Sequence, residues 1–124
     1  MVFDILSDLL KINEVLLIIR NNGAISETKS NSLHIKQKGK WITIGDSEGP
    51  SHMHINVELI KCVEFVKENR NDHTSFSVRF FDQNGDRILG AFFTKMYDQN
   101  NTLNFERMQT YEKLCQKYGS KIRF

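Results

Sequence analysis

One stretch, residues 74–95 (TSFSVRFFDQNGDRILGAFFTK), constrains the fold of this chain more than any other. At its centre, Asn84-Gly85 is typical of a two-residue type I′ turn, in which both central positions need φ > 0. The stretch is therefore predicted to form an antiparallel hairpin. Its register is fixed, because a slip of one residue would exchange the buried and exposed faces. The predicted cross-strand pairs nearest the turn are Asp82 with Arg87, Phe81 with Ile88, and Phe80 with Leu89.

The two faces of this predicted hairpin differ in character. One face is wholly apolar and is predicted to meet the core; it carries Phe76, Val78, Phe80, Leu89, Ala91 and Phe93. The other face sets a charge and a glycine among aromatic rings; it carries Ser77, Arg79, Phe81, Ile88, Gly90 and Phe92. A mixed face of this kind is half-covered, or it lines a cavity or a subunit contact.

The remaining segments predict an α+β fold. Apolar residues at helical spacing indicate a helix over 3–12, and a final helix capped by Asn101 or Thr102 should run to Tyr118, where Gly119 ends it. Residues 15–19 favour a buried strand, although a helix continuing to Arg20 also fits. Between them, alternating patterns predict strands at 24–29, 33–36, 41–44, 51–55 and 59–66, with polar loops at 46–50 and 68–73.

These elements predict a single domain over residues 1–124, in which an N-terminal and a C-terminal helix pack on a curved antiparallel sheet of about seven or eight strands. The formal net charge is only +2, so nucleic-acid binding is not expected. Residues 15–19 are the longest apolar run and are too short for stable membrane insertion. The acidic N-terminus is unlike a signal peptide. We expect a cytoplasmic protein with reduced Cys62 and Cys115, although a disulfide between them stays open.

His52 and His54 form the sharpest local feature for binding chemistry. Residues i and i+2 of a strand project from the same face, so both imidazoles can address one ligand, and imidazole is a common ligand of transition metals and haem iron. Two solvated histidines on a half-buried strand fit the same pattern, and by itself the pattern favours that reading. A structural zinc is disfavoured, since no thiolate or carboxylate lies nearby at ligand spacing.

A basic segment precedes the histidines. Lysines 36, 38 and 40 stand beside Trp41, and such a segment either binds carboxylates or phosphates or is a solvated face. The chain carries no Gly-rich phosphate loop, no Cys-x-x-Cys, no His-Glu-x-x-His and no nucleophile elbow. The common catalytic motifs therefore suggest no reaction.

Residues 52–114 resemble the bacterial haem-utilisation carriers of the hemin transport and degradation superfamily. The resemblance rests on a His-containing strand (Met53-His54-Ile55), a following strand (Ile60 to Val66), an aromatic hairpin with the turn Asp82-Gln83-Asn84-Gly85, and a helix with Tyr111 three residues before Leu114. The helix-then-strand order of residues 5–28 also fits. Long members carry two such modules in tandem, and this chain has the length of one, which resembles the short, dimeric carriers.

The resemblance implies a cytoplasmic haem carrier or chaperone that binds b-type haem and forms a homodimer. It implies His54 as the iron ligand, with His52 as a neighbour or second choice, and Arg79 or the lysines between 36 and 40 as partners of the haem propionates. Two other functions stay open. One is a haem-degrading enzyme that opens the porphyrin ring, and the other is a small-ligand or protein-interaction module that keeps the fold without haem.

Overall fold

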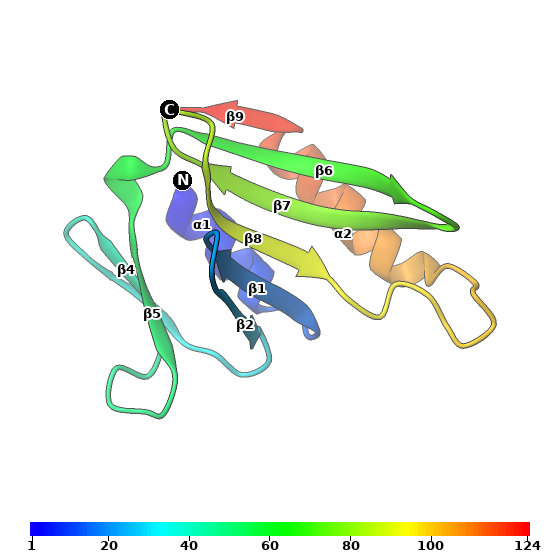
Figure 1. Cartoon of the computed structure of the whole chain (residues 1–124), viewed down its shortest axis with the longest axis horizontal. Helices are drawn as coiled ribbons and strands as arrows, with labels where there is room; N and C mark the ends of the chain where they lie inside the picture. Colours follow the sequence, from blue (N-terminus) through cyan, green and yellow to red (C-terminus); the bar gives the residue numbers. More distant parts are fainter.

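The structure is a computed structural model that describes all of residues 1–124, and it confirms the α+β class. Helices α1 (Val2–Leu10) and α2 (Phe105–Tyr118) lie on one side of a six-stranded antiparallel sheet (Figure 1). This sheet has the order β2 (Ile25–Lys29), β1 (Val15–Arg20), β8 (Arg87–Phe93), β7 (His73–Phe81), β6 (Cys62–Arg70) and β9 (Lys121–Arg123). Three further strands form a separate sheet: β3 (Ile35–Lys38), β4 (Trp41–Gly45) and β5 (His52–Asn56).

The division into two sheets differs from the single curved sheet that the sequence predicted. The chain leaves β5 through a short 3-10 helix, Val57–Leu59, and this turn separates β5 from β6. Two other details differ. β9 follows the last helix where no strand was expected, and β6 and β7 extend through the predicted loop 68–73, leaving only Asn71 and Asp72 between them. Residues 69–73 are exposed and polar, so the sequence there shows no alternation of apolar and polar residues from which strands could be predicted.

The β7–β8 hairpin confirms the predicted faces and corrects the predicted turn. Phe80 pairs with Leu89, as expected. Gly85 has φ +80°, but Asn84 does not have positive φ, so the turn is not type I′. Instead Asp82 closes a three-residue loop: its backbone N donates to Asp86 O, and its carboxylate accepts from the N–H groups of Asn84 and Asp86. This side chain stabilises a different turn from the one that Asn84-Gly85 alone would favour.

A β-bulge restores the register between this longer loop and the rest of the hairpin. Phe81 pairs with Arg87 rather than with Ile88, and Phe80 still pairs with Leu89, so Ile88 is the extra residue. The predicted pairs of Asp82 with Arg87 and of Phe81 with Ile88 are therefore wrong. A bulge bends the strand and redirects the residue beside it. Arg87 consequently shares a face with Phe81 and not with Leu89.

The core lies between the six-stranded sheet and the helices. The predicted apolar face of the hairpin is buried throughout, and Tyr111 of α2 packs edge-on against the rings of Phe65, Phe76 and Phe93. The small sheet contributes Ile42, Ile44 and Ile55 from its inner face to the same cluster. The opposite face of the six-stranded sheet is not covered by any element of the chain, and below it is called the open face.

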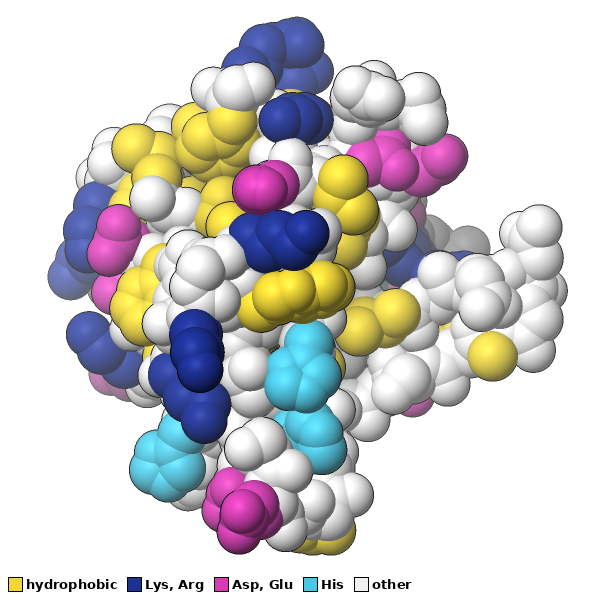
Figure 2. Space-filling view, turned by 90° about the vertical axis from the view of Figure 1, so that its left-hand side faces the viewer, with side chains coloured by type: hydrophobic (Ala, Val, Ile, Leu, Met, Phe, Trp, Pro, Cys, Tyr) yellow, Lys and Arg dark blue, Asp and Glu magenta, His cyan; other side chains and the backbone are white.

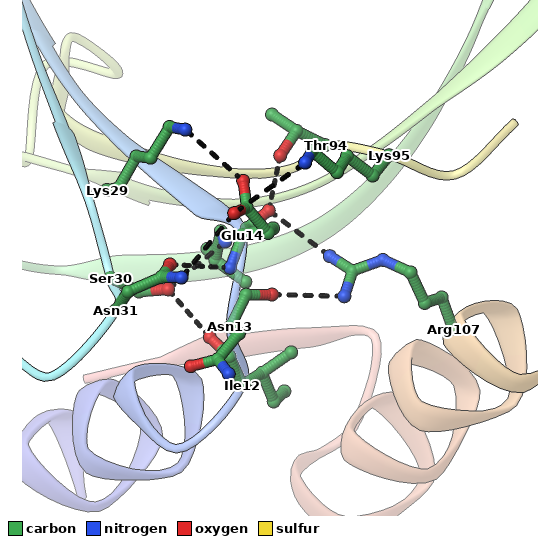
Figure 3. A network of polar contacts seen from close by, with 10 residues as sticks. Ile12, Asn13, Glu14, Lys29, Ser30, Asn31, Thr94, Lys95 and Arg107 are labelled. Atoms are coloured by element: carbon green, nitrogen blue, oxygen red, sulfur yellow. Dashed lines mark hydrogen bonds and ion pairs between the residues drawn. The ribbon is translucent and has the colours of Figure 1, made fainter. Parts of the chain in front are cut away.

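A polar network around Glu14 joins elements that are distant in sequence (Figure 3). Arg107 of α2 donates to the backbone carbonyls of Asn13 and Glu14, at 3.0 and 3.2 Å. The Glu14 carboxylate lies 3.5 Å from Lys29 Nζ, and the backbone N of Thr94 donates to Glu14 O. The network holds the α1–β1 junction against β2, the end of β8 and α2.

The ends of α2 are close to the predicted ones. Gly119 ends the helix with φ +95°, as expected. The N-cap is Asn104, whose side chain accepts from Arg107 N, and not Asn101 or Thr102. Thr102 is held in the preceding turn by the Asp98 carboxylate, which accepts from its backbone N.

Both cysteines are free thiols. Neither helix has the length and apolar content that crossing a bilayer requires.

Candidate functional site

The outer face of the small sheet gathers the basic and histidine residues singled out in the sequence. Strand pairing aligns Lys36 of β3 with Thr43 of β4, and Thr43 with His54 of β5. The neighbouring row aligns Lys38 with Trp41. The alternate residues Ile42 and Ile44 point to the core, so Trp41, Thr43 and the histidines occupy the opposite side.

An open pocket of about 480 Å³ lies on this face, lined by Lys36, Lys38, Trp41, Thr43, Ser47 and His54. Figure 2 looks onto this side of the molecule, where histidine side chains stand next to lysine and apolar groups. Trp41 is 45% exposed, an unusual degree of exposure for the only tryptophan of the chain. The pocket thus combines an aromatic surface, two ammonium groups and an imidazole.

Thr43 positions the His54 ring. The Thr43 hydroxyl lies 2.8 Å from His54 Nδ1, and Thr43 is 7% exposed, so its rotamer is held by packing. In the tautomer with the proton on Nδ1, the ring donates to Thr43 Oγ1 and leaves the Nε2 lone pair free. A hydrogen bond to one ring nitrogen is what orients metal-binding histidines through the other. The arrangement therefore suits a single imidazole–metal bond.

His52 lies beside His54, as the alternation predicts. The two ring centroids are 5.1 Å apart in an edge-to-face arrangement. No group of three or more His, Cys, Asp or Glu side chains is placed to hold a metal ion, so the histidines do not form part of a closed protein-only metal site. A metal bound here needs further ligands from a macrocycle or solvent.

Arg79 is not brought to this pocket. It lies on β7, with its side chain on the open face of the large sheet, where its Nε donates to Ser77 Oγ at 3.0 Å and its guanidinium lies over the Phe92 ring. Lys40 does not line the histidine pocket either, since it sits in the β3–β4 turn. Of the predicted basic residues, only Lys36 and Lys38 accompany His54.

Sequence reasoning missed two residues of this face. Thr43 was assigned only to a strand, although its pairing with His54 gives the ring its orientation. Ser47 comes from the loop after β4. His34 lies in line with His52, because its backbone carbonyl accepts from Gly45 N, but its side chain is exposed and does not line the pocket. The cross-strand register was the missing signal, and alternation within one strand does not reveal it.

Comparison with known proteins now decides the family. A family model matches residues 3–119, which is nearly the whole chain. The chain belongs to the family that this model describes, and it shares the fold of the heme-binding protein ChuX and of the heme oxygenase ChuS. No curated protein sequence matches it significantly. The assignment predicted from the hairpin and the His-containing strand is confirmed.

Solved structures share the fold at low identity. A protein from Erwinia carotovora superposes with a TM-score of 0.76 at 20% identity, over 92% of this chain and 69% of the other. The heme-binding protein ChuX gives 0.76 at 14% identity, over 92% and 70%. ChuS, a heme oxygenase of Escherichia coli, gives 0.71 at 24% identity, over 92% of this chain but only 32% of ChuS.

Proposed function

We propose that this protein binds b-type haem on the outer face of the small sheet and acts as a cytoplasmic haem carrier. The observation that carries the proposal is the Thr43–His54 hydrogen bond inside a pocket with an exposed indole and two lysines. The fold shared with the heme-binding proteins ChuX and PhuS supports haem as the ligand. The heme-binding protein ChuX shares the fold over most of the length of both chains.

Each part of the pocket matches a part of haem. His54 Nε2 is the proposed axial ligand, and His52, 5.1 Å away between ring centroids, is the neighbour that can take its place. The Trp41 ring offers a flat apolar surface to the macrocycle. Lys36 and Lys38 offer ammonium groups to the two propionates. Haem supplies the iron and its four equatorial nitrogens, and the protein supplies position and charge.

The carrier function is favoured over haem degradation by the openness of this pocket. Ring-opening chemistry needs a shielded distal side that excludes water, and here His54 and Trp41 are both exposed. A haem-degrading enzyme remains the second candidate, and a small-ligand or interaction module without haem is the third.

A hemin titration of the purified protein tests the proposal. The expected result is a Soret band that saturates at one hemin per chain. Absence of saturable binding would leave only the small-ligand or interaction module. Adding a chemical reductant under air to the haem complex then separates the other two functions: a carrier retains haem, whereas a degrading enzyme releases a ring-opened product.

We also propose a homodimer, following the resemblance to the short carriers. The part of the open face that β1 and β6 form is the surface available for it, because partly buried apolar side chains there lack an intramolecular cover: Leu16, Ile18 and Val66. Sedimentation at tens of micromolar should give about twice the 14.5 kDa chain mass. A single species at the chain mass would reject the dimer.

A further inference from the structure

A second cleft, larger than the histidine pocket, lies at one end of the open face. Its volume is about 730 Å³, and it is lined mainly by polar side chains, among them Arg20, Asn21, Asn22, Arg79 and Arg87. The three arginines come from β1, β7 and β8, which are neighbouring strands in the sheet order. The haem proposal uses none of this cleft.

The β-bulge at Ile88 puts Arg87 into this cleft. Without the bulge, Arg87 would alternate with Leu89 onto the core face. With it, Arg87 pairs with Phe81, and its guanidinium lies 5.3 Å from the centroid of the Phe92 ring. Bulges commonly redirect one side chain toward a functional site. Here the redirected group is a cation.

The Phe92 ring and the Arg87 guanidinium lie close to the backbone of Gly90. Gly90 lies between Ile18 of β1 and Arg79 of β7 in the register. A Cβ at this position would meet Phe92 Cε1 at 2.6 Å and the Arg87 guanidinium carbon at 3.4 Å. The missing side chain therefore lets the Phe92 ring lie close to the backbone. The guanidinium of Arg79 lies 5.4 Å from the centroid of the same ring, so two cations lie over Phe92.

The positive charge of the cleft is only partly neutralised within the chain. Neither Arg20 nor Arg87 forms an ion pair; Arg79 lies 3.5 Å from Glu68, which also pairs with Arg70 at 2.7 Å. Asp86 lines the cleft without approaching an arginine to ion-pair distance. Burial lowers the pKa of Arg87, and the nearby charge of Arg79 lowers it further. Because two of the three arginines have no ion-pair partner, the cleft favours an anionic ligand.

We propose that this arginine cleft is a binding site for a small polyanion that carries at least two oxyanion groups, as phosphates or carboxylates. Guanidinium forks bind such oxygens in bidentate, charge-assisted hydrogen bonds. Three arginines on adjacent strands can pair with more oxygens than one carboxylate offers, which favours a molecule with a second oxyanion group. The Asn21 and Asn22 side chains, at the end of β1, can add neutral donors. The site is independent of the haem proposal.

Calorimetric titration with pyrophosphate, citrate and acetate tests the site. Pyrophosphate and citrate distinguish phosphate from carboxylate recognition, and acetate is the single-charge control. At least one polyanion is expected to bind with one ligand per chain and at least ten-fold tighter than acetate. Arg87→Gln and Arg20→Gln should each weaken that binding at least ten-fold. Lys38→Gln removes the same charge from the other sheet and should leave it within two-fold of the parent.

Gly90→Ala provides a test that changes no charge. The added methyl group displaces the Phe92 ring, so polyanion affinity should fall while hemin binding stays unchanged, which also shows that the variant folds. The proposal is overturned if neither polyanion binds saturably below 10 mM (roughly 2.7 kcal/mol at the limit), or if Arg87→Gln binds as the parent does. Displacement of the polyanion by one equivalent of hemin, or one polyanion per two chains, would equally overturn it.

Discussion

The six-stranded sheet and the three-stranded sheet differ in what they bury. The large sheet buries a whole face against two helices, with Phe80, Val78 and Leu89 at 0–1% exposure. The small sheet buries Ile42, Ile44 and Ile55 and leaves Trp41 and His54 in solvent on its other face. Hydrophobic stabilisation follows the apolar area removed from water, so the large sheet dominates stability. The small sheet is free to carry ligand groups, because few of its side chains are needed for folding.

The largest expected effect comes from a matched pair of aromatic truncations, one in each sheet. Phe80→Ala should lower the free energy of unfolding by about 3–5 kcal/mol, because a fully buried ring leaves a cavity. Trp41→Ala should cost less than about 1 kcal/mol, since this residue is 45% exposed. Urea denaturation of the two variants measures both. Equal losses would contradict the division between the sheets.

The next effect concerns the turn that fixes the large sheet's hairpin. Gly85 has φ +80°, and no atom lies within 4 Å of the position of an added Cβ, so only backbone strain penalises a side chain there. Gly85→Val should lower the free energy of unfolding by roughly 1–2 kcal/mol, the cost of placing an L-residue in the left-handed region. Gly85→Asn should cost much less, because asparagine tolerates this region. Equal melting temperatures of the two variants would argue against this turn.

A smaller, pH-dependent effect is expected where the two helices meet. The Asp8 carboxylate accepts hydrogen bonds from Lys117 Nζ and Tyr118 Oη. Burial acts to raise the pKa of Asp8, but these hydrogen bonds outweigh it and the pKa falls below its ordinary 3.8. The stabilisation is therefore complete above the ordinary pKa and disappears as pH falls through the lowered one.

Asp8→Asn tests this contact. At pH 6 the variant should be less stable than the parent by about 1 kcal/mol or less, as expected for a partly exposed ion pair. The difference should shrink as the pH is lowered past 3.8 and the parent's carboxyl becomes neutral. Thermal melts at several pH values follow this change. A difference that is independent of pH would show that the charge of Asp8 is not what stabilises the helix pair.

How much could be predicted from the sequence also differs between the sheets. Alternation identified both faces of the hairpin, because one face is apolar at every position from Phe76 to Phe93. It did not reveal the turn, where the Asp82 side chain selects a longer loop, nor the bulge that redirects Arg87. Such features depend on a few local hydrogen bonds and leave the hydrophobic pattern unchanged.

For the candidate site, the sequence identified His52 and His54 and the lysines beside Trp41. It could not place them in one pocket, because that depends on which strands pair. Thr43 carries no distinctive signal in the sequence, and its contact with His54 follows only from the β4–β5 register. The position of Arg79 also depends on which strands pair. The resemblance implies that it binds the haem propionates beside the histidines, but it lies on the large sheet.

The measurement that tests the central claim most directly is a hemin titration of three histidine variants. His54→Ala should weaken hemin binding at least ten-fold and change the Soret spectrum, because the axial nitrogen is lost. His73→Ala, in the large sheet, should bind as the parent does. His52→Ala should have an intermediate effect. All three residues are exposed, so melting temperatures should remain close to the parent's. A His54→Ala protein with the parent's spectrum and affinity would contradict the assignment of the small sheet as the haem-binding surface.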